Sequence, residues 1–492
     1  MKKLKKYEKL TLYLIILGTV IRFLIMLFVD VSAEPAWHVN IARYMANNLR
    51  IPLFEHLGRD VFWPPPAFHI LMAIFYKVFS IFGENAAIFG AQLVTPILAS
   101  LTLLFNYLIV KHLFDDKVGF YSSLFLAFLP AHLYFSTLAY VDITLMLFVL
   151  MSIYFALKRK YVLSGLFSAI SMLTKYTGIL AILIVVPMIA IKEKKKIKSY
   201  LEYLYTLPLG LIWFIRNWIL LGNPVWHFLN DLFKGYASST SVRGGSLLNF
   251  VSLRPIKTLY AGLIGIPASR WSNLFYFEIP FLKIFVTIWL IGTGIYFLPI
   301  LLGIKNLNKQ KNIFLFWLAP FVLMALAYIY DMNTLFLRFF FPVIPILGIS
   351  WAFGFIKIEK MAKTKKAWLK PAITIFILIL VGITAVEFGK AYMSTKWIRN
   401  YKVDFDWIKQ NTDRDDIFLI EGDQAPSFYF DRFTYYSIEI KNLSKIDYVW
   451  INPTLPSPYE YDKEFIKELE TNYRLAYSNN STKTIIYKID KK

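Results

Sequence analysis

Long apolar runs separated by short basic clusters are the feature that most constrains how this chain folds. The chain has 492 residues, of which 57% are hydrophobic and 18% aromatic. The hydrocarbon core of a bilayer is about 30 Å thick, and a helix of about 20 apolar residues crosses it. Because many runs of that length are present, the sequence predicts an α-helical polytopic membrane protein.

The basic residues lie mainly between these apolar runs. The formal net charge of +22 would indicate nucleic-acid binding in a soluble protein. No separate basic domain is visible, so we expect no nucleic-acid partner. Clusters such as 158–160 (KRK) and 192–198 (KEKKKIK) are typical of cytoplasmic loops that face anionic lipid.

The positive-inside rule predicts the order of the membrane spans. The apolar segment 67–83 would reverse the side of every later loop if it spanned, so we interpret it as an interfacial or re-entrant helix. All the basic clusters then share the side of the N-terminus. The prediction is about 11 transmembrane helices in the cell membrane, with the N-terminus cytoplasmic and the C-terminal end extracytoplasmic. The expected spans are roughly 9–29, 86–111, 117–135, 139–157, 160–174, 177–192, 199–221, 281–303, 312–330, 336–357 and 369–389.

The N-terminal segment has two interpretations. A Lys-rich start, an apolar run and then Val31-Ser32-Ala33 are typical of a cleaved signal peptide. The apolar run is long enough to span, however, and the most informative residues begin directly after it. We therefore expect an uncleaved first helix.

The span order predicts two domains. Residues 1–389 would form a transmembrane domain with outer loops at 30–85 and 222–280, and residues 390–492 an extracytoplasmic α/β domain. The C-terminal region is polar and Tyr-rich, with strand-like and helix-like runs. An amphipathic helix is also expected in the first outer loop. These runs are DIFLI (416–420), IDYVWI (446–451), DFDWIKQN (404–411) and the outer-loop segment near 35–49.

Two acidic residues stand beside predicted outer membrane surfaces. Glu34 follows the first span and Asp142 lies at the start of the span 139–157. A carboxylate at a membrane boundary costs free energy unless it is solvated, paired or used. Either residue also suits a simpler role, since acids favour helix N-termini and Pro35 suits a first helical turn. Two carboxylates on one face nevertheless favour a catalytic or ion-binding site.

Cationic residues are expected at the same level. Lys175 and Tyr176 lie at the tip of a predicted helical hairpin, Arg216 and Asn217 near the end of a span, and Arg338 in an aromatic stretch. Arg and Lys donors bind phosphate, and a carboxylate can accept a proton from a hydroxyl nucleophile. Lys175 and Arg216 would alternatively be anchors that reach toward the interface.

Six short motifs follow one another between about 30 and 390. The first contains an acid, a histidine and an Ile-Ala-Arg run, and the others are built from prolines, a second acid and the cations. They are Glu34-Pro35-Ala36-Trp37-His38 with Ile41-Ala42-Arg43, Pro64-Pro65-Pro66 with His69, Pro130 with Asp142, Thr174 and Lys175 with Gly178, Arg216 and Asn217 with Gly222, Asn223 and Pro224, and Arg338 with Pro342-Val343-Ile344-Pro345.

In this order the motifs resemble those of the C-type (GT-C) membrane glycosyltransferases that use polyprenyl-phosphate sugars. The likeness is to the family of dolichyl-phosphate-mannose protein mannosyltransferases and lipid A aminoarabinose transferases. The resemblance implies an inverting hexosyl- or pentosyltransferase acting on a glycan, lipid or protein acceptor. A transporter or flippase for lipid-linked sugars is the alternative, although it would place polar residues at the bilayer midplane.

The resemblance also implies roles for particular residues. Catalytic roles fall to Glu34 and Asp142, with Glu34 as the base. Phosphate binding falls to Lys175, Arg216 and Arg338. The substrate groove would include His38, Arg43, His69, Tyr176 and Asn217.

Two further expectations concern the first acid and metal ions. The family's first acid is usually Asp, so Glu34 is a departure, and Asp30 is a second candidate for the base. The lipid-monophosphate branch of the family needs no metal, so we expect no cofactor. A divalent cation between the two acids is a less favoured alternative. The absence of cysteine excludes disulfides and thiolate sites.

Overall fold

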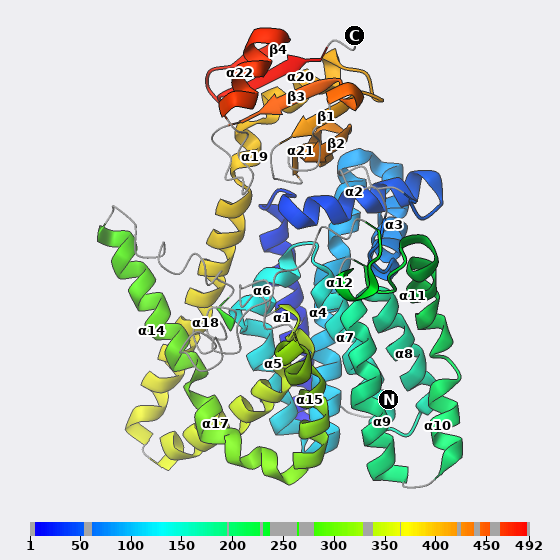
Figure 1. The fold of residues 1–492 in the computed structure, drawn as a ribbon. Helices are drawn as coiled ribbons and strands as arrows, with labels where there is room; N and C mark the ends of the chain where they lie inside the picture. Colours follow the sequence, from blue (N-terminus) through cyan, green and yellow to red (C-terminus); the bar gives the residue numbers. More distant parts are fainter. Residues whose placement is uncertain are drawn as a thin grey trace.

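The apolar runs form helices that pack against one another in a bundle (Figure 1). This computed structural model describes residues 5–53, 62–193, 196–226, 230–236, 263–264, 280–327, 338–364, 366–420, 425–436, 443–452 and 463–489. Most of the predicted outer loop 222–280 therefore lies outside the described residues.

Each of the 11 expected spans corresponds to a helix or a pair of helices among the described residues. Six of the described helices are long and apolar enough to cross a membrane, or up to eight if each bent pair counts as one span. The chain is thus a multi-pass membrane protein, and the number 11 stays a prediction. The bundle helices are α1 (Lys6–Leu27), α4 (Glu84–Leu113), α5 (Asp116–Phe128), α6 (Pro130–Thr137), α7 (Val141–Leu157), α8 (Tyr161–Thr174), α9 (Leu180–Glu193), α10 (Ile197–Leu204), α11 (Pro208–Leu221), α14 (Pro280–Gly303), α15 (Lys311–Ala327), α17 (Ile344–Thr364) and α18 (Lys366–Thr395).

Prolines account for the two sharp bends. α5 and α6 meet at 61° and α10 and α11 at 51°. Pro130 and Pro208 are the first residues of the second helix in each pair. Proline has no N–H to donate, so it interrupts the helical hydrogen bonds and the chain restarts in a new direction. Leu129 before Pro130 is extended, whereas Leu207 before Pro208 keeps helical dihedral angles.

Ion pairs gather the predicted cytoplasmic residues at one end of the bundle. Lys111 contacts Glu8 at 2.6 Å, which joins the end of α4 to the start of α1, and Lys117 contacts Glu359 of α17 at 2.7 Å. In Figure 1 this end lies opposite the C-terminal sheet. The two ends of the bundle are therefore separated as the positive-inside rule requires, while their assignment to the cytoplasm and the exterior stays a prediction.

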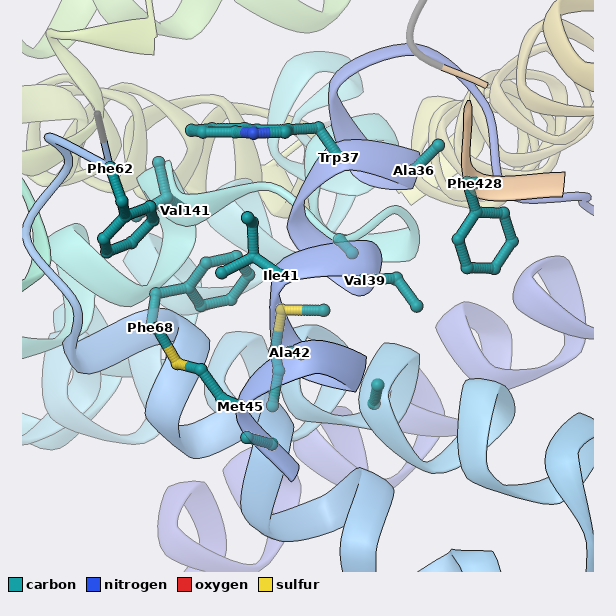
Figure 2. Packing of buried hydrophobic residues seen from close by; sticks show 14 of the residues in the cluster. Ala36, Trp37, Val39, Ile41, Ala42, Met45, Phe62, Phe68, Val141 and Phe428 are labelled. Carbon is teal, nitrogen blue, oxygen red and sulfur yellow. The ribbon is translucent and has the colours of Figure 1, made fainter. Parts of the chain in front are cut away.

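Two helices of the first outer segment lie at the other end of the bundle. α2 (Ala33–Asn48), predicted near 35–49, runs across that end beneath the C-terminal sheet, and α3 (Ala67–Phe79) packs against both α2 and α4 (Figure 1). Apolar residues of α2 join Phe68 of α3 and Phe428 in one buried cluster (Figure 2). The amphipathic sequence of α2 therefore holds it between the bundle and the C-terminal region.

The C-terminal region forms a five-stranded sheet flanked by helices, as predicted. The strand order is β2-β1-β3-β5-β4; β1 is parallel to β2 and β3, whereas β5 is antiparallel to β3 and β4. The predicted strands and helix coincide with β1, β3 and α20. The elements are α19 (Trp397–Asn400), α20 (Lys402–Asn411), β1 (Ile417–Ile420), α21 (Ala425–Phe430), β2 (Phe433–Tyr436), β3 (Tyr448–Ile451), α22 (Lys463–Asn472), β4 (Arg474–Asn479) and β5 (Thr484–Lys488).

Polar contacts hold this region against α2. Arg43 contacts Asp431 at 3.0 Å, donates to the carbonyl of Phe428 and lies over the Phe428 ring at 5.1 Å. Arg399, which follows α18, contacts Asp30 at 2.7 Å. Since α18 continues to Thr395, a domain boundary at 389/390 stays a prediction.

Candidate active site

A cavity of about 300 Å³ lies where α2, α3, α7, α8 and the segment before α17 meet. Its volume is at the lower end of the range for small-molecule sites, about 300–1,000 Å³. The lining is mostly apolar and aromatic, with a few charged side chains. It consists of Glu34, Trp37, His38, Trp63, Pro64, Pro65, His69, Val141, Thr174, Lys175, Tyr176, Thr177, Ile179, Leu180, Val225, Arg338 and Phe339.

Four charged side chains form a continuous array at this cavity. Lys175 Nζ lies 2.6 Å from Asp142 Oδ1, and Asp142 Oδ2 lies 3.6 Å from Arg338 Nη1. Arg338 Nη1 in turn donates to Glu34 Oε2 at 2.5 Å. The structure thus brings together the two predicted catalytic acids and two of the three predicted phosphate ligands. Because two acids face two cations, the array is balanced in charge.

Local structure explains how each charged residue reaches the cavity. Glu34 is in the first turn of α2 and Asp142 in the first turn of α7, positions that favour carboxylates through the helix dipole. Lys175 lies between α8 and a 3₁₀ turn, Tyr176–Ile179. Gly178 makes this tip tight, since a Cβ there would come within 2.0 Å of the Ser171 carbonyl oxygen.

Burial makes the array electrostatically strong. The Asp142 side chain is fully buried and that of Arg338 is 9% exposed, while Glu34 keeps 29% exposure where it faces the cavity. Burial opposes the ionisation of Glu34, but the adjacent Arg338 and His38 outweigh it. The pKa of Glu34 is therefore held well below its usual range, and Glu34 is ionised at neutral pH.

Several polar atoms at the cavity have no hydrogen-bond partner among the described residues. They belong to side chains that line it or, for Asp142, complete the charged array. Buried polar groups are nearly always paired, so unpaired atoms gathered at one cavity indicate a place for a ligand. The atoms are Asp142 Oδ2, Thr177 Oγ1 and Arg338 Nε.

Aromatic residues form one wall of the cavity. Trp63 stacks on Tyr176 with ring centroids 5.9 Å apart, and the Tyr176 hydroxyl donates to the Trp63 carbonyl. Asn217, fully buried behind this wall, donates to the Tyr176 hydroxyl at 2.6 Å and to the Trp63 carbonyl at 2.9 Å. Tyr176 thus lines the cavity, whereas Asn217 supports the aromatic wall from outside.

Arg216 is the predicted phosphate ligand that the structure does not bring into the cavity. Its Nη1 donates to the Phe62 carbonyl at 2.5 Å and to Asn217 Oδ1 at 2.7 Å, and its guanidinium lies over the Trp213 ring. Arg216 therefore fixes the segment that carries Trp63.

Two other predicted residues also lie away from the cavity. Arg43 lines a separate polar cleft of about 760 Å³ between α2 and the strands β1 and β2. Asp30, the second candidate for the base, pairs with Arg399 instead. By position, Glu34 is thus the acid at the cavity, and Arg43 belongs to the contact with the C-terminal region.

Sequence reasoning missed several of the residues that line the cavity. Trp63 and Phe339 each stand next to a motif residue, Trp37 lies within the first motif but has no role in the predicted site, and Thr177 lies within the Lys175 hairpin tip. The signal available was this adjacency, because ligand pockets are lined mainly by apolar and aromatic side chains around a few polar groups.

The arrangement of Glu34 and Asp142 suits pairing with the side chains of Arg338 and Lys175 better than binding of a divalent metal ion. Arg338 lies between Glu34 and Asp142, in the position that a bridging metal would take. Within the described ranges no three His, Cys, Asp or Glu side chains gather as a metal site. Metal independence stays a prediction.

The chain is similar to a known protein family and to solved structures. Residues 64–220 match the model of the dolichyl-phosphate-mannose-protein mannosyltransferase family, which is less than half of the chain but includes Asp142 and Lys175. No curated protein matches the chain in sequence.

Solved structures match over nearly the whole chain. The apo structure of ArnT from Cupriavidus metallidurans has a TM-score of 0.63 and 11% identity, with 97% of each chain covered. The structure of the same protein bound to undecaprenyl phosphate has a TM-score of 0.61 and 13% identity, again with 97% of each chain covered. The apo structure of the Archaeoglobus fulgidus oligosaccharyltransferase has a TM-score of 0.58 and 11% identity, with 91% of this chain and 70% of that chain covered.

At such low identity these structures establish the fold, and the family match adds the sequence pattern of residues 64–220. Together they support glycosyl transfer from a lipid-phosphate donor. The chain has the GT-C fold with a small C-terminal sheet, and its resemblance to the polyprenyl-phosphate-sugar-dependent membrane glycosyltransferases is confirmed.

Proposed function

We propose that this protein is an inverting glycosyltransferase that moves a sugar from a polyprenyl-phosphate carrier to a hydroxyl or similar nucleophile on the extracytoplasmic face. The observation that carries the proposal is the array of Lys175, Asp142, Arg338 and Glu34 at one apolar, aromatic cavity. The wall of a channel does not require two cations that are each paired with a carboxylate, as Lys175 is with Asp142 and Arg338 with Glu34. A transferase needs both a phosphate site and a base.

The phosphate of the donor would bind at the Lys175 end of the array. Lys175 is a point-charge donor and Arg338 offers a planar fork, and both types bind phosphate oxygens. As the bond to the sugar breaks, the phosphate gains charge, which these cations stabilise. Val141, Ile179 and Leu180 give an apolar lining for the first carbon units of the carrier. The fold shared with a protein that binds undecaprenyl phosphate supports this assignment.

Glu34 would act as the general base for the acceptor. Inversion requires the nucleophile and the leaving phosphate to lie on opposite sides of the reacting carbon. Arg338 and Asp142 separate Lys175 from Glu34 along the array, so phosphate and base have distinct ends. Trp37 and Trp63 line the space beside them and offer ring faces to a sugar.

The resting site is closed by its own ion pairs, and donor binding would open it. Arg338 is bound to Glu34 at 2.5 Å, so a phosphate must draw Arg338 away from this carboxylate. The pKa of Glu34 then rises, because the cation that lowers it is shared with phosphate. A stronger base would thus form only when donor is present.

Turnover of a defined donor tests the proposal. Purified protein in nanodiscs is incubated with a panel of polyprenyl-phosphate hexoses and pentoses, with water or methanol as the nucleophile. We expect release of polyprenyl phosphate and a methyl glycoside of the opposite anomeric configuration. The Glu34→Gln variant serves as the inactive control.

The same preparation in liposomes tests the alternative. A transporter would move the sugar-lipid between leaflets without releasing polyprenyl phosphate. Movement of donor with no turnover of any donor in the panel would overturn the transferase proposal. A methyl glycoside of unchanged configuration would overturn inversion alone.

A further inference from the structure

Two buried histidines extend the charged array beyond Glu34. His38 Nε2 lies 3.5 Å from Glu34 Oε1, and His38 Nδ1 lies 2.8 Å from His69 Nε2. His38 is 2% exposed and His69 1% exposed. The array therefore continues from the base into the protein, on the side of Glu34 away from Arg338.

Packing fixes the orientation of both imidazole rings. The His38 ring lies 5.1 Å from the Phe68 ring, and the His69 ring lies 5.5 Å from Phe62 and 5.6 Å from Trp37. A ring flip of His38 would break the contact with His69 and turn a carbon toward Glu34. The side chains around the pair thus hold His38 Nε2 toward the carboxylate.

The hydrogen bond between the histidines limits where their protons lie. One nitrogen of the contact must donate and the other accept. If His69 Nε2 donates, neutral His38 carries its proton on Nε2. If His38 Nδ1 donates, only a His38 that is also protonated on Nε2 avoids facing a lone pair toward ionised Glu34. In both arrangements His38 Nε2–H points at Glu34.

We propose that His38 is a positioning residue that holds the catalytic carboxylate of Glu34 through its Nε2–H, and that His69 in turn fixes the orientation of His38. This inference rests on the proposed function, because it gives the base its geometry.

The two oxygens of Glu34 would then have different roles. Oε1 stays bound to His38, while Oε2 is released when the donor phosphate draws Arg338 away. In the transfer, the acceptor oxygen bonds to the anomeric carbon and the carbon–oxygen bond to phosphate breaks, its electron pair going to the phosphate. The acceptor's proton moves to Oε2.

The pH dependence distinguishes positioning from a purely structural role. The charged and titratable groups that face Glu34 and His38 are Arg338, Lys175, Asp142, Tyr140 and His69. Contact with His38 lowers the pKa of Glu34, so its removal raises that pKa. A base with a raised pKa is protonated at higher pH, and the acid limb of kcat/KM therefore moves to higher pH.

The experiment compares donor hydrolysis from pH 4.5 to 8 for His38→Leu, His38→Gln and His69→Leu. We expect kcat of His38→Leu to fall about 10–100-fold, as for a misplaced catalytic group. Its acid limb should move up in pH while the donor KM changes less than about threefold. Glutamine keeps an N–H near the same place, so His38→Gln should recover activity. His69→Leu should act in the same direction, more weakly.

His132→Leu is the matched control, since His132 is also fully buried but contacts Arg22. We expect the acid limb of kcat/KM for His132→Leu to lie at the same pH as that of the wild type. An unshifted limb in His38→Leu, or an equal shift in His132→Leu, overturns the positioning role while leaving the transferase intact. A wild-type protein that turns over no donor overturns both.

Discussion

Two buried arginines of the helical region, Arg338 and Arg22, have opposite surroundings. Arg338 lies at a cavity, contacts two carboxylates and keeps an Nε with no hydrogen-bond partner among the described residues. Arg22 of α1 is fully buried and forms no ion pair within the described part of the chain. Both carry charge into an apolar region, where ionisable residues usually serve function.

Arg22 instead completes the bend between α5 and α6. It donates to the Ala127 carbonyl at 3.1 Å, to Ser136 at 2.6 Å and to the Gly18 carbonyl at 2.9 Å, and it contacts His132 at 2.9 Å. Ala127 lies before the break at Pro130, and His132 and Ser136 lie after it. Every guanidinium nitrogen has a partner, so no ligand is needed to satisfy it.

The difference shows what separates a structural buried charge from a functional one. Arg22 binds fixed carbonyl and hydroxyl groups, whereas Arg338 binds carboxylates, which a phosphate would replace in the proposed function. Removing Arg338 leaves Glu34 without its cation and Asp142 with Lys175 alone, which is costly for buried charges. Removing Arg22 leaves only neutral acceptors without a donor.

The largest effect is expected at the base. Glu34→Gln should lower kcat by about 100–10,000-fold, since a general base contributes that much. Steady-state release of polyprenyl phosphate measures it. Glu84→Gln is the matched control, because Glu84 lies at the same end of the bundle and contacts Arg43, not the cavity cations. A Glu34→Gln variant with more than about a third of wild-type kcat would exclude Glu34 as the base.

The next effect separates cations inside and outside the cavity. Lys175→Met should lower kcat by about 100–1,000-fold, the usual loss for one donor to developing charge. Arg216→Met should instead weaken the packing of the Phe62–Trp63 segment and change undecaprenyl phosphate affinity less than about threefold. Donor turnover and the binding of undecaprenyl phosphate, both measured on the two purified variants, check the difference. Equal losses of affinity would place Arg216 in the phosphate site.

Arg22 tests the structural side of the comparison. Arg22→Met should lower the free energy of unfolding by about 1–3 kcal/mol, because buried acceptors lose their donor. The kcat of the folded protein should stay within about threefold of the wild type. Thermal unfolding and the donor assay on the same preparation measure both. A loss of kcat as large as that of Lys175→Met would mean that Arg22 is functional.

A smaller effect is expected where the C-terminal region meets α2. Arg43→Ala removes the contacts with Asp431 and the Phe428 carbonyl. We expect a loss of about 1 kcal/mol in stability, typical of a partly exposed pair, and a fall of a few-fold in kcat because α2 also carries Glu34. Unchanged stability together with lost donor binding would instead assign Arg43 to the substrate groove.

The smallest effect is expected from metal removal. Arg338 holds the two acids together, so EDTA should change the turnover rate less than about twofold. A loss of activity that Mn²⁺ or Mg²⁺ restores would show that a metal, and not the arginine, links the acids during turnover.

The sequence predicts correctly those features that depend on a short stretch of chain, such as a motif residue at the start of a helix. Glu34 in the first turn of α2 and Asp142 in the first turn of α7 follow from the order of apolar runs and helix starts. Strands β1 and β3 follow from the apolar and aromatic runs 416–420 and 446–451. These features depend on short stretches of chain, so their patterns are visible without the structure.

Pairing across the bundle could not be predicted in the same way. Arg338 reaches Glu34 across a sequence separation of 304 residues, and a sequence pattern does not give the direction of a side chain. Arg216 shows the converse, because its motif is intact but its guanidinium points to the Phe62 carbonyl. The histidine pair was likewise invisible, since each histidine alone suits a buried structural role.

The position of α2 has a mechanical consequence. In this one helix Glu34 and His38 face the cavity, while Ala36 and Val39 point toward Phe428 of the C-terminal region (Figure 2). One added residue would turn the helix beyond it by about 100°. The number of residues between Glu34 and Arg43 therefore sets the direction of Glu34 toward the cavity relative to the contacts of α2 with the C-terminal region.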